Sequence, residues 1–196
     1  MSRLKPLSAD ATPELKSHFD FFLGTLGFTP NSVLTMQRKP HLVKAFAQLN
    51  AAVMTPDGEV NLGFRRLIGH LASKASGCLY CQAHTLLGAK NFGISEEKMA
   101  AVWNYADSDL YSPAEKIALD FALAAASQPN AVSDEMFTQL SQHWSEGQIV
   151  EILGVVAMFG FLNRWNDSMA TPLESSPLEV AQKAAGSHGF SAGKHV

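Results

Sequence analysis

The sequence predicts an all-α fold of about eight to ten helices. No run of residues alternates apolar and polar side chains over the length of a strand, so we expect no β-sheet. Helix-capping patterns recur along the chain, and turns containing proline or glycine separate the segments between them. The helices are expected at residues 12–26, 31–38, 40–54, 60–75, 78–90, 95–105, 113–127, 133–143, 146–168 and 176–186.

Four serines mark the clearest helix starts. Ser112-Pro113-Ala114-Glu115 is a capping box with proline at the first helical position. Ser95 and Ser133 each precede two acidic residues, which suit the first turn of a helix. Ser145, with Gln148 three positions later, opens the most apolar stretch of the chain.

The apolar stretch covers residues 149–162 and contains Glu151. A membrane span needs about 20 apolar residues, so we interpret this stretch as a buried core helix. The first fifteen residues contain no apolar segment of the kind found in secretory signal peptides. A cytoplasmic protein with no membrane partner is therefore expected.

The length and composition predict one domain over residues 1–196, with a core at about 60–170 and a tail at about 187–196. The net charge is −3 and no run of Lys or Arg occurs, which argues against binding nucleic acid. No glycine-rich phosphate loop is present, and no residue pattern requires a cofactor or a metal.

The chain has two cysteines, Cys78 and Cys81, and they are three residues apart. Ser76-Gly77 should end the preceding helix, so Cys78 falls at the start of the next one. The two thiols and His84 should then follow one another at steps of about one helical turn. Helix amides and an imidazole favour the thiolate, and neighbouring thiols can close a disulfide after one is oxidised. This pattern favours thiol redox chemistry, with His84 moving a proton.

Two other interpretations of the cysteines stay open. Cys78, Cys81 and His84 could bind zinc with a fourth ligand, for which His70 is the candidate, although the usual spacing is absent. The cysteines could also be inert core residues.

The segment GCLYCQAHT around Cys78 and Cys81 resembles the signature of the alkylhydroperoxidase D-like proteins, in the carboxymuconolactone decarboxylase superfamily. The resemblance is to the peroxidase-related branch and extends from about Val60 to Lys194. The agreeing segments are Cys78–Thr85, Ser112–Glu115, Glu151 in its apolar helix, Leu162–Asp167 and Gly193–His195.

The resemblance implies an alkylhydroperoxidase D-like helical bundle that assembles as a dimer, trimer or hexamer. It also implies reduction of an organic hydroperoxide, with a dithiol reductant restoring the enzyme. Cys81 would become the sulfenic acid, Cys78 would resolve it, and His84 would belong to a proton relay.

This sequence departs from the family pattern at two places. Only two residues separate Cys81 from His84, where well-studied members have three. Arg66 stands twelve residues before Cys78, where those members have the glutamate of the relay. His70 and Glu151, both in apolar surroundings, are the candidates to replace that glutamate.

Several polar or aromatic residues are candidates for the substrate pocket. Tyr80, between the cysteines, could line it. Asn163, Trp165 and Asn166 follow the apolar helix, where their polar groups need hydrogen-bond partners. They could lie beside the thiols or fasten that end of the helix.

The sequence therefore predicts a thiol-dependent peroxidase-like oxidoreductase. One alternative is a decarboxylase- or isomerase-like enzyme of the same superfamily that uses His84. Another is a non-enzymatic, metal-binding or redox-sensing oligomer.

Overall fold

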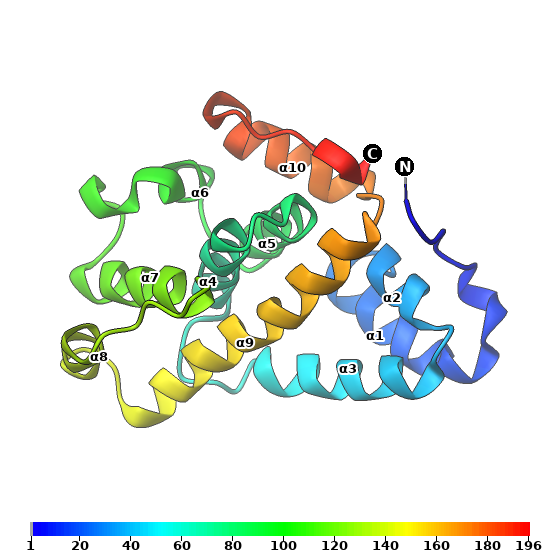
Figure 1. The fold of residues 1–196 in the computed structure, drawn as a ribbon, viewed down its shortest axis with the longest axis horizontal. Helices are drawn as coiled ribbons and strands as arrows, with labels where there is room; N and C mark the ends of the chain where they lie inside the picture. Colours follow the sequence, from blue (N-terminus) through cyan, green and yellow to red (C-terminus); the bar gives the residue numbers. More distant parts are fainter. Residues whose placement is uncertain (1) are drawn as a thin grey trace.

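The computed structural model describes residues 2–196, and over that range it contains helices but no strand (Figure 1). The predicted all-α class is therefore confirmed. The ten α-helices are α1 (Lys16–Leu26), α2 (Asn31–Met36), α3 (Pro40–Val53), α4 (Leu62–Ala75), α5 (Leu79–Asn91), α6 (Glu96–Ala100), α7 (Pro113–Ala126), α8 (Asp134–Ser141), α9 (Glu146–Met169) and α10 (Ser175–Ala185). Short 3₁₀ segments lie at Ala9–Ala11, Pro13–Leu15, Ala101–Asp107, Gly186–His188 and Gly193–His195.

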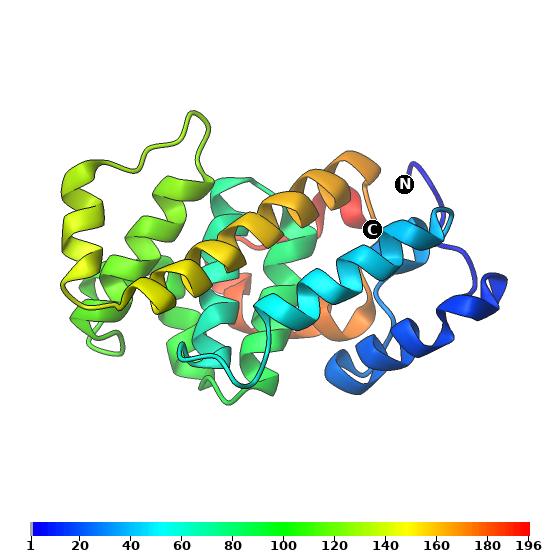
Figure 2. The ribbon, with the colours of Figure 1, turned by 90° about the horizontal axis from the view of Figure 1, so that it is seen from below.

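Helix α4 lies at the centre of the molecule. All of its residues from Gly63 to Ser73 are buried, and it packs against α5, α7 and α9. Helix α9 crosses this group diagonally and links the two ends of the molecule (Figure 1). Seen from below, α3 and α9 run side by side in opposite directions (Figure 2).

Helix α3 packs against α9 and carries α1 and α2 on it, while α7 and α8 pack at the amino-terminal half of α9 (Figure 2). Helix α10 packs on α5, and the C-terminal turn Gly193–His195 also rests on α5. The first and last parts of the chain thus enclose the helix that carries both cysteines.

The predicted caps are present. Ser112 and Ser145 each form a full capping box, and the Ser95 and Ser133 hydroxyls accept from backbone N–H groups of their helices. Two predicted boundaries are wrong. The helix expected from residue 12 begins as a 3₁₀ turn at Pro13 before α1, and the one expected over 95–105 changes to 3₁₀ geometry after Ala100.

Helix α9 is long and apolar enough to cross a membrane, judged by length and composition alone. One face of it, including Ile152, Val155 and Phe159, is buried against α3, α4, α5 and α7. This packing agrees with the interpretation of residues 149–162 as a core helix.

Candidate functional site

A Schellman motif at the end of α4 places Cys78. Gly77 has φ +70°, its N–H donates to Lys74 O at 3.1 Å, and the Cys78 N–H donates to Ser73 O at 3.1 Å. The left-handed conformation suits glycine, as the sequence predicts. Cys78 is consequently the N-cap of α5, and Cys81 follows within the first turn.

Both thiols are free and buried, with 0% of Cys78 and 1% of Cys81 exposed. Hydrogen bonds from the Cys81 side chain, and from the N–H groups at the start of α5, hold the pKa of Cys78 below its usual value against the effect of burial. Burial, together with the bond to Cys78, raises the pKa of Cys81 well above its usual value. The Nδ2 of Asn166 donates to Cys81 Sγ at 3.4 Å.

A carboxylate from the distant C-terminal region binds His84. Glu174, the N-cap of α10, has its Oε2 2.7 Å from His84 Nε2. Its Oε1 accepts from the Tyr80 hydroxyl at 2.9 Å and from the Asn31 N–H at 2.6 Å. The Tyr80 and His84 rings stack with centroids 4.2 Å apart. Tyr80, Glu174 and His84 therefore form one hydrogen-bonded group beside Cys81.

The surroundings of Glu174 and Tyr80 determine the protonation state of each. Burial opposes ionisation of Glu174, but the His84 charge and the hydrogen bonds it accepts hold the pKa of the carboxyl below its usual value. Burial, followed by the Glu174 charge, raises the pKa of Tyr80 well above its usual value. Glu174 is thus an anion near neutral pH, and Tyr80 is a neutral donor.

A narrow cavity of about 50 Å³ opens onto Cys81, Tyr80 and His84. Its apolar wall comes mainly from the N-terminal helices and α9, with Phe22, Leu26, Val33, Phe46, Phe159 and Leu162. The volume exceeds the roughly 30 Å³ that one water molecule occupies in the liquid. A small polar group can enter the cavity and reach the Cys81 thiol, whereas an aromatic ring can enter only if side chains of the cavity wall move.

Arg66 lies on the cavity wall. It occupies the sequence position at which well-studied family members have the relay glutamate. Its guanidinium packs over Phe92, and burial followed by the charge of Arg65 lowers its pKa to about 10. Arg66 therefore keeps its positive charge at neutral pH and cannot act as a base.

His70 occupies a different position from the one expected of a relay residue. Its Nδ1 lies 3.2 Å from Gln82 O and 3.1 Å from Thr85 Oγ1, and its ring packs edge-on against Trp103. Burial lowers the pKa of His70 to about 4, so the ring is neutral. The structure gives His70 a role in fastening α4 to α5, because its Nδ1 contacts the Gln82 carbonyl and the Thr85 hydroxyl of α5 and not a thiol.

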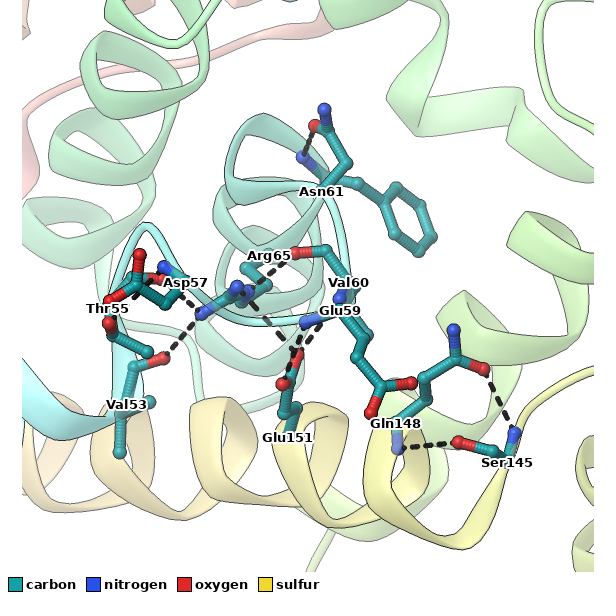
Figure 3. Close-up of polar contacts among 11 residues, drawn as sticks. Val53, Thr55, Asp57, Glu59, Val60, Asn61, Arg65, Ser145, Gln148 and Glu151 are labelled. Carbon is teal, nitrogen blue, oxygen red and sulfur yellow. Dashed lines mark hydrogen bonds and ion pairs between the residues drawn. The ribbon is translucent and has the colours of Figure 1, made fainter.

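Glu151 was the other candidate for the relay, and the structure does not place it there (Figure 3). Its carboxylate accepts from the N–H groups of Glu59 and Val60, each at 2.9 Å, and lies 3.7 Å from the Arg65 guanidinium. Arg65 in turn donates to the carbonyls of Val53, Thr55 and Val60. This pair holds the loop between α3 and α4.

The polar residues after the apolar helix divide between two roles. Asn166 lines the cavity and contacts Cys81, as predicted for a residue beside the thiols. Asn163 donates to Ala72 O at 3.4 Å and joins α9 to α4, while Trp165 stacks with Phe161 at 6.3 Å between ring centroids. Asn163 thus fastens α9 to α4, Trp165 stacks along α9 itself, and neither lines the cavity.

The structure also separates the histidines proposed as zinc ligands. His84 is bound to Glu174 and His70 faces α5 backbone, so neither completes a site with the two cysteines. Over residues 2–196, the three-residue cluster with converging metal-binding atoms is instead Cys78, Asp167 and His195.

The sequence did not indicate three parts of the site. These are Glu174, the cavity wall formed by the N-terminal helices, and His195 in its cluster with Cys78 and Asp167. Glu174 follows Thr171-Pro172-Leu173 in a loop and has no sequence signal of its own. His195 belongs to a segment that agreed with the family, which is the one signal that could have drawn attention to it.

The fold and the site define an all-helical protein with a buried cysteine pair at a helix start. The carboxymuconolactone decarboxylase family pattern matches residues 40–124. The crystal structure of the debrominase Bmp8 is similar to this chain, with 32% identity, a TM-score of 0.86, and coverage of 92% of this chain and 96% of that one. The chain belongs to the carboxymuconolactone decarboxylase family.

Other relatives agree with this assignment. A cysteine-to-alanine variant of Bmp8 in complex with 2,3,4-tribromopyrrole gives a TM-score of 0.87. An alkylhydroperoxidase AhpD core, an uncharacterized peroxidase-related protein from Ralstonia eutropha JMP134, is 25% identical with a TM-score of 0.78, over 93% of this chain and 96% of that one. The uncharacterized protein YdfG of Bacillus subtilis (strain 168) is 27% identical over 57% of this chain and 75% of its own length.

Proposed function

We propose that this protein is a thiol-dependent oxidoreductase that reduces small hydroperoxides through Cys81 and Cys78. The observation that carries the proposal is the position of the Cys81 thiol on an apolar-walled cavity, with a second thiol beside it. Cys78 is buried outside that cavity and has the position expected of a resolving cysteine.

The reaction proceeds in two steps. The Cys81 thiol gives its proton to His84 as its sulfur attacks one oxygen of the O–O bond, which breaks, and that proton passes to the departing alkoxide to give an alcohol and a sulfenic acid. The Cys78 thiolate then attacks the Cys81 sulfur, water leaves with one added proton, and a disulfide forms. A dithiol reductant restores both thiols by exchange.

The Tyr80–Glu174–His84 group supplies the proton in this scheme. His84 lines the cavity, and Glu174 binds its Nε2 side. A carboxylate partner orients an imidazole and stabilises its protonated form, as in other acid–base groups. The Asn166 Oδ1 has no hydrogen-bond partner among residues 2–196 and can accept the hydroperoxide O–H.

A second function, reductive dehalogenation, is supported by the similarity to the debrominase Bmp8. In this reaction one aryl bromide and the two thiols give the arene, hydrogen bromide and the same Cys78–Cys81 disulfide. The cavity of about 50 Å³ favours the hydroperoxide, since a brominated ring fits only after the wall widens.

The test uses the two cysteine variants. Cys81→Ser should abolish hydroperoxide consumption, whereas Cys78→Ser should stop after one step and leave a sulfenic acid that dimedone traps. A Cys78→Ser variant that cannot be oxidised, with Cys81→Ser still reactive, would reverse the roles. Consumption of an aryl bromide but not of hydroperoxide would favour dehalogenation.

We further propose a cytoplasmic homo-oligomer. A reducing compartment keeps such a cysteine pair in the dithiol form. Helix α9 exposes Val150, Leu153 and Phe161, of which Val150 is 70% exposed, and self-association would cover these side chains. Light scattering on the purified chain measures the assembly, and a monomer at all concentrations would contradict it.

A further inference from the structure

The C-terminal turn carries a histidine into the interior of the protein. Gly193–His195 rests on α5, and His195 is 1% exposed. Gly193 has φ +54°, a left-handed conformation that favours glycine, and a Cβ there would lie 2.8 Å from Leu79 Cδ1. The backbone carbonyl of His195 also accepts from the Leu173 N–H at 2.8 Å.

The His195 ring is oriented by the backbone. Its Nδ1 lies 2.8 Å from Thr171 O, and because a carbonyl only accepts, Nδ1 carries the hydrogen. The other nitrogen, Nε2, has no hydrogen-bond partner among residues 2–196 and is buried. This is how metal-binding histidines are held, with one nitrogen donating to a carbonyl and the other left to bind.

Two further ligand atoms converge on Nε2. Asp167 Oδ1 lies 3.8 Å from it, and Cys78 Sγ completes a set in which all three atoms lie within 4.8 Å of one another. The second Asp167 oxygen, Oδ2, is bound by Lys194 Nζ at 2.7 Å, which leaves Oδ1 for the cluster.

We propose that Cys78, Asp167 and His195 form a binding site for zinc. A thiolate, an imidazole and a carboxylate are the ligands that zinc accepts, and water can take the fourth position. With bonds of about 2.0–2.3 Å, neighbouring ligands in a tetrahedral site lie about 3.3–3.7 Å apart. The separation of Nε2 and Oδ1 must therefore shorten by about 0.5 Å on binding, and Cys78 Sγ, which lies within 4.8 Å of both atoms, closes the set.

The site also has a route of entry. A surface groove of about 530 Å³ is lined by Ala75, Ser76, Arg164, Asp167 and Ser168, and the Asp167 side chain is 38% exposed. A cation can reach Asp167 first and then the two buried ligands. Binding replaces the Cys78 proton, which is released to solvent.

This inference does not need the proposed reaction, although it uses the same Cys78. If the proposed function holds, zinc occupies the resolving thiol and disulfide closure waits until the metal leaves. Metal binding can be measured without any peroxide, so failure of one proposal is distinguishable from failure of the other.

The experiment loads the reduced, full-length protein with zinc chloride or cobalt chloride. After dialysis we expect about one zinc per chain by elemental analysis, and a thiolate-to-cobalt charge-transfer band with cobalt. His195→Gln, Asp167→Asn and Cys78→Ser should each weaken zinc binding at least tenfold. His188→Gln, which changes an exposed histidine of the same tail, should bind zinc as the unchanged protein does.

Circular dichroism checks that each variant is folded, and Asp167→Asn is the most informative because its side chain is partly exposed. Three results would overturn the proposal. The unchanged protein could retain no zinc, His195→Gln and Asp167→Asn could keep full affinity, or His188→Gln could lose the metal while His195→Gln keeps it.

Discussion

The Oε2 atom of Glu174 lies 2.7 Å from the Nε2 atom of His84, although ninety positions separate the two residues in the chain. Family resemblance predicts a relay glutamate twelve residues before Cys78, where this chain has Arg66. Glu174 enters from the start of α10 on the other side of α5 and supplies a carboxylate to the same histidine.

Replacing Glu174 by Gln should lower kcat about tenfold to a hundredfold with hydroperoxide, and leave KM nearly unchanged. The amide removes the negative charge beside His84 but preserves the size of the side chain. Steady-state kinetics measure the effect, with Glu179→Gln on the exposed face of α10 as the matched control. Equal kcat values for the two variants would remove Glu174 from the relay.

The neutral, buried ring of His70 should make the free energy of unfolding depend on pH. Its folded pKa of about 4 lies below the ordinary value of 6.5, so between these values the unfolded chain binds a proton that the folded chain does not. Stability should therefore fall as the pH drops from 6.5 to 4, by about 3 kcal/mol from this residue.

Urea unfolding between pH 7 and pH 4 tests that expectation. His70→Asn, which keeps a donor near the Gln82 carbonyl, should flatten the dependence, whereas His143→Gln at an exposed position should leave it intact. Identical pH profiles for His70→Asn and the unchanged protein would show that His70 does not carry the effect.

Glu151→Gln should affect stability and not activity. Its carboxylate holds two loop N–H groups and faces the buried Arg65, so the change should lower the free energy of unfolding by about 1–3 kcal/mol. Denaturant unfolding and kcat/KM should be measured together, with the exposed first-turn variant Glu146→Gln as control. A stable but inactive Glu151→Gln protein would return Glu151 to the relay.

Leu26→Ala should widen the cavity at its N-terminal wall. The ratio of kcat/KM for cumene hydroperoxide to that for tert-butyl hydroperoxide should rise about tenfold or more, since one methylene in an apolar pocket changes discrimination by about tenfold at least. Leu23→Ala on the same helix is the control, because Leu23 is 52% exposed and does not line the cavity. An equal change in both variants would mean that the cavity does not select substrate size.

The helices could be predicted because their signals are local. Ser112 with Glu115, and Ser145 with Gln148, contain the whole capping interaction within four residues. Gly77 likewise predicts the end of α4, since its left-handed conformation is a property of a single position. Cys78 and Cys81 follow as neighbours from helix geometry alone.

The rest of the site depends on contacts between distant segments. Glu174 and Glu151 are both carboxylates near apolar sequence, and only the tertiary packing makes one a partner of His84 and the other a partner of Arg65. The aromatic side chains Phe22 and Phe46 predict buried helix faces, but no local pattern predicts that these faces line the same cavity as Cys81.

The most direct test of the central claim is a free-thiol count with intact mass, before and after one equivalent of an organic hydroperoxide. We predict that both thiols disappear together and that the mass falls by two hydrogens, because Cys81 is oxidised and Cys78 closes the disulfide. Two thiols that remain unchanged in folded, metal-free protein would contradict the thiol-peroxidase account.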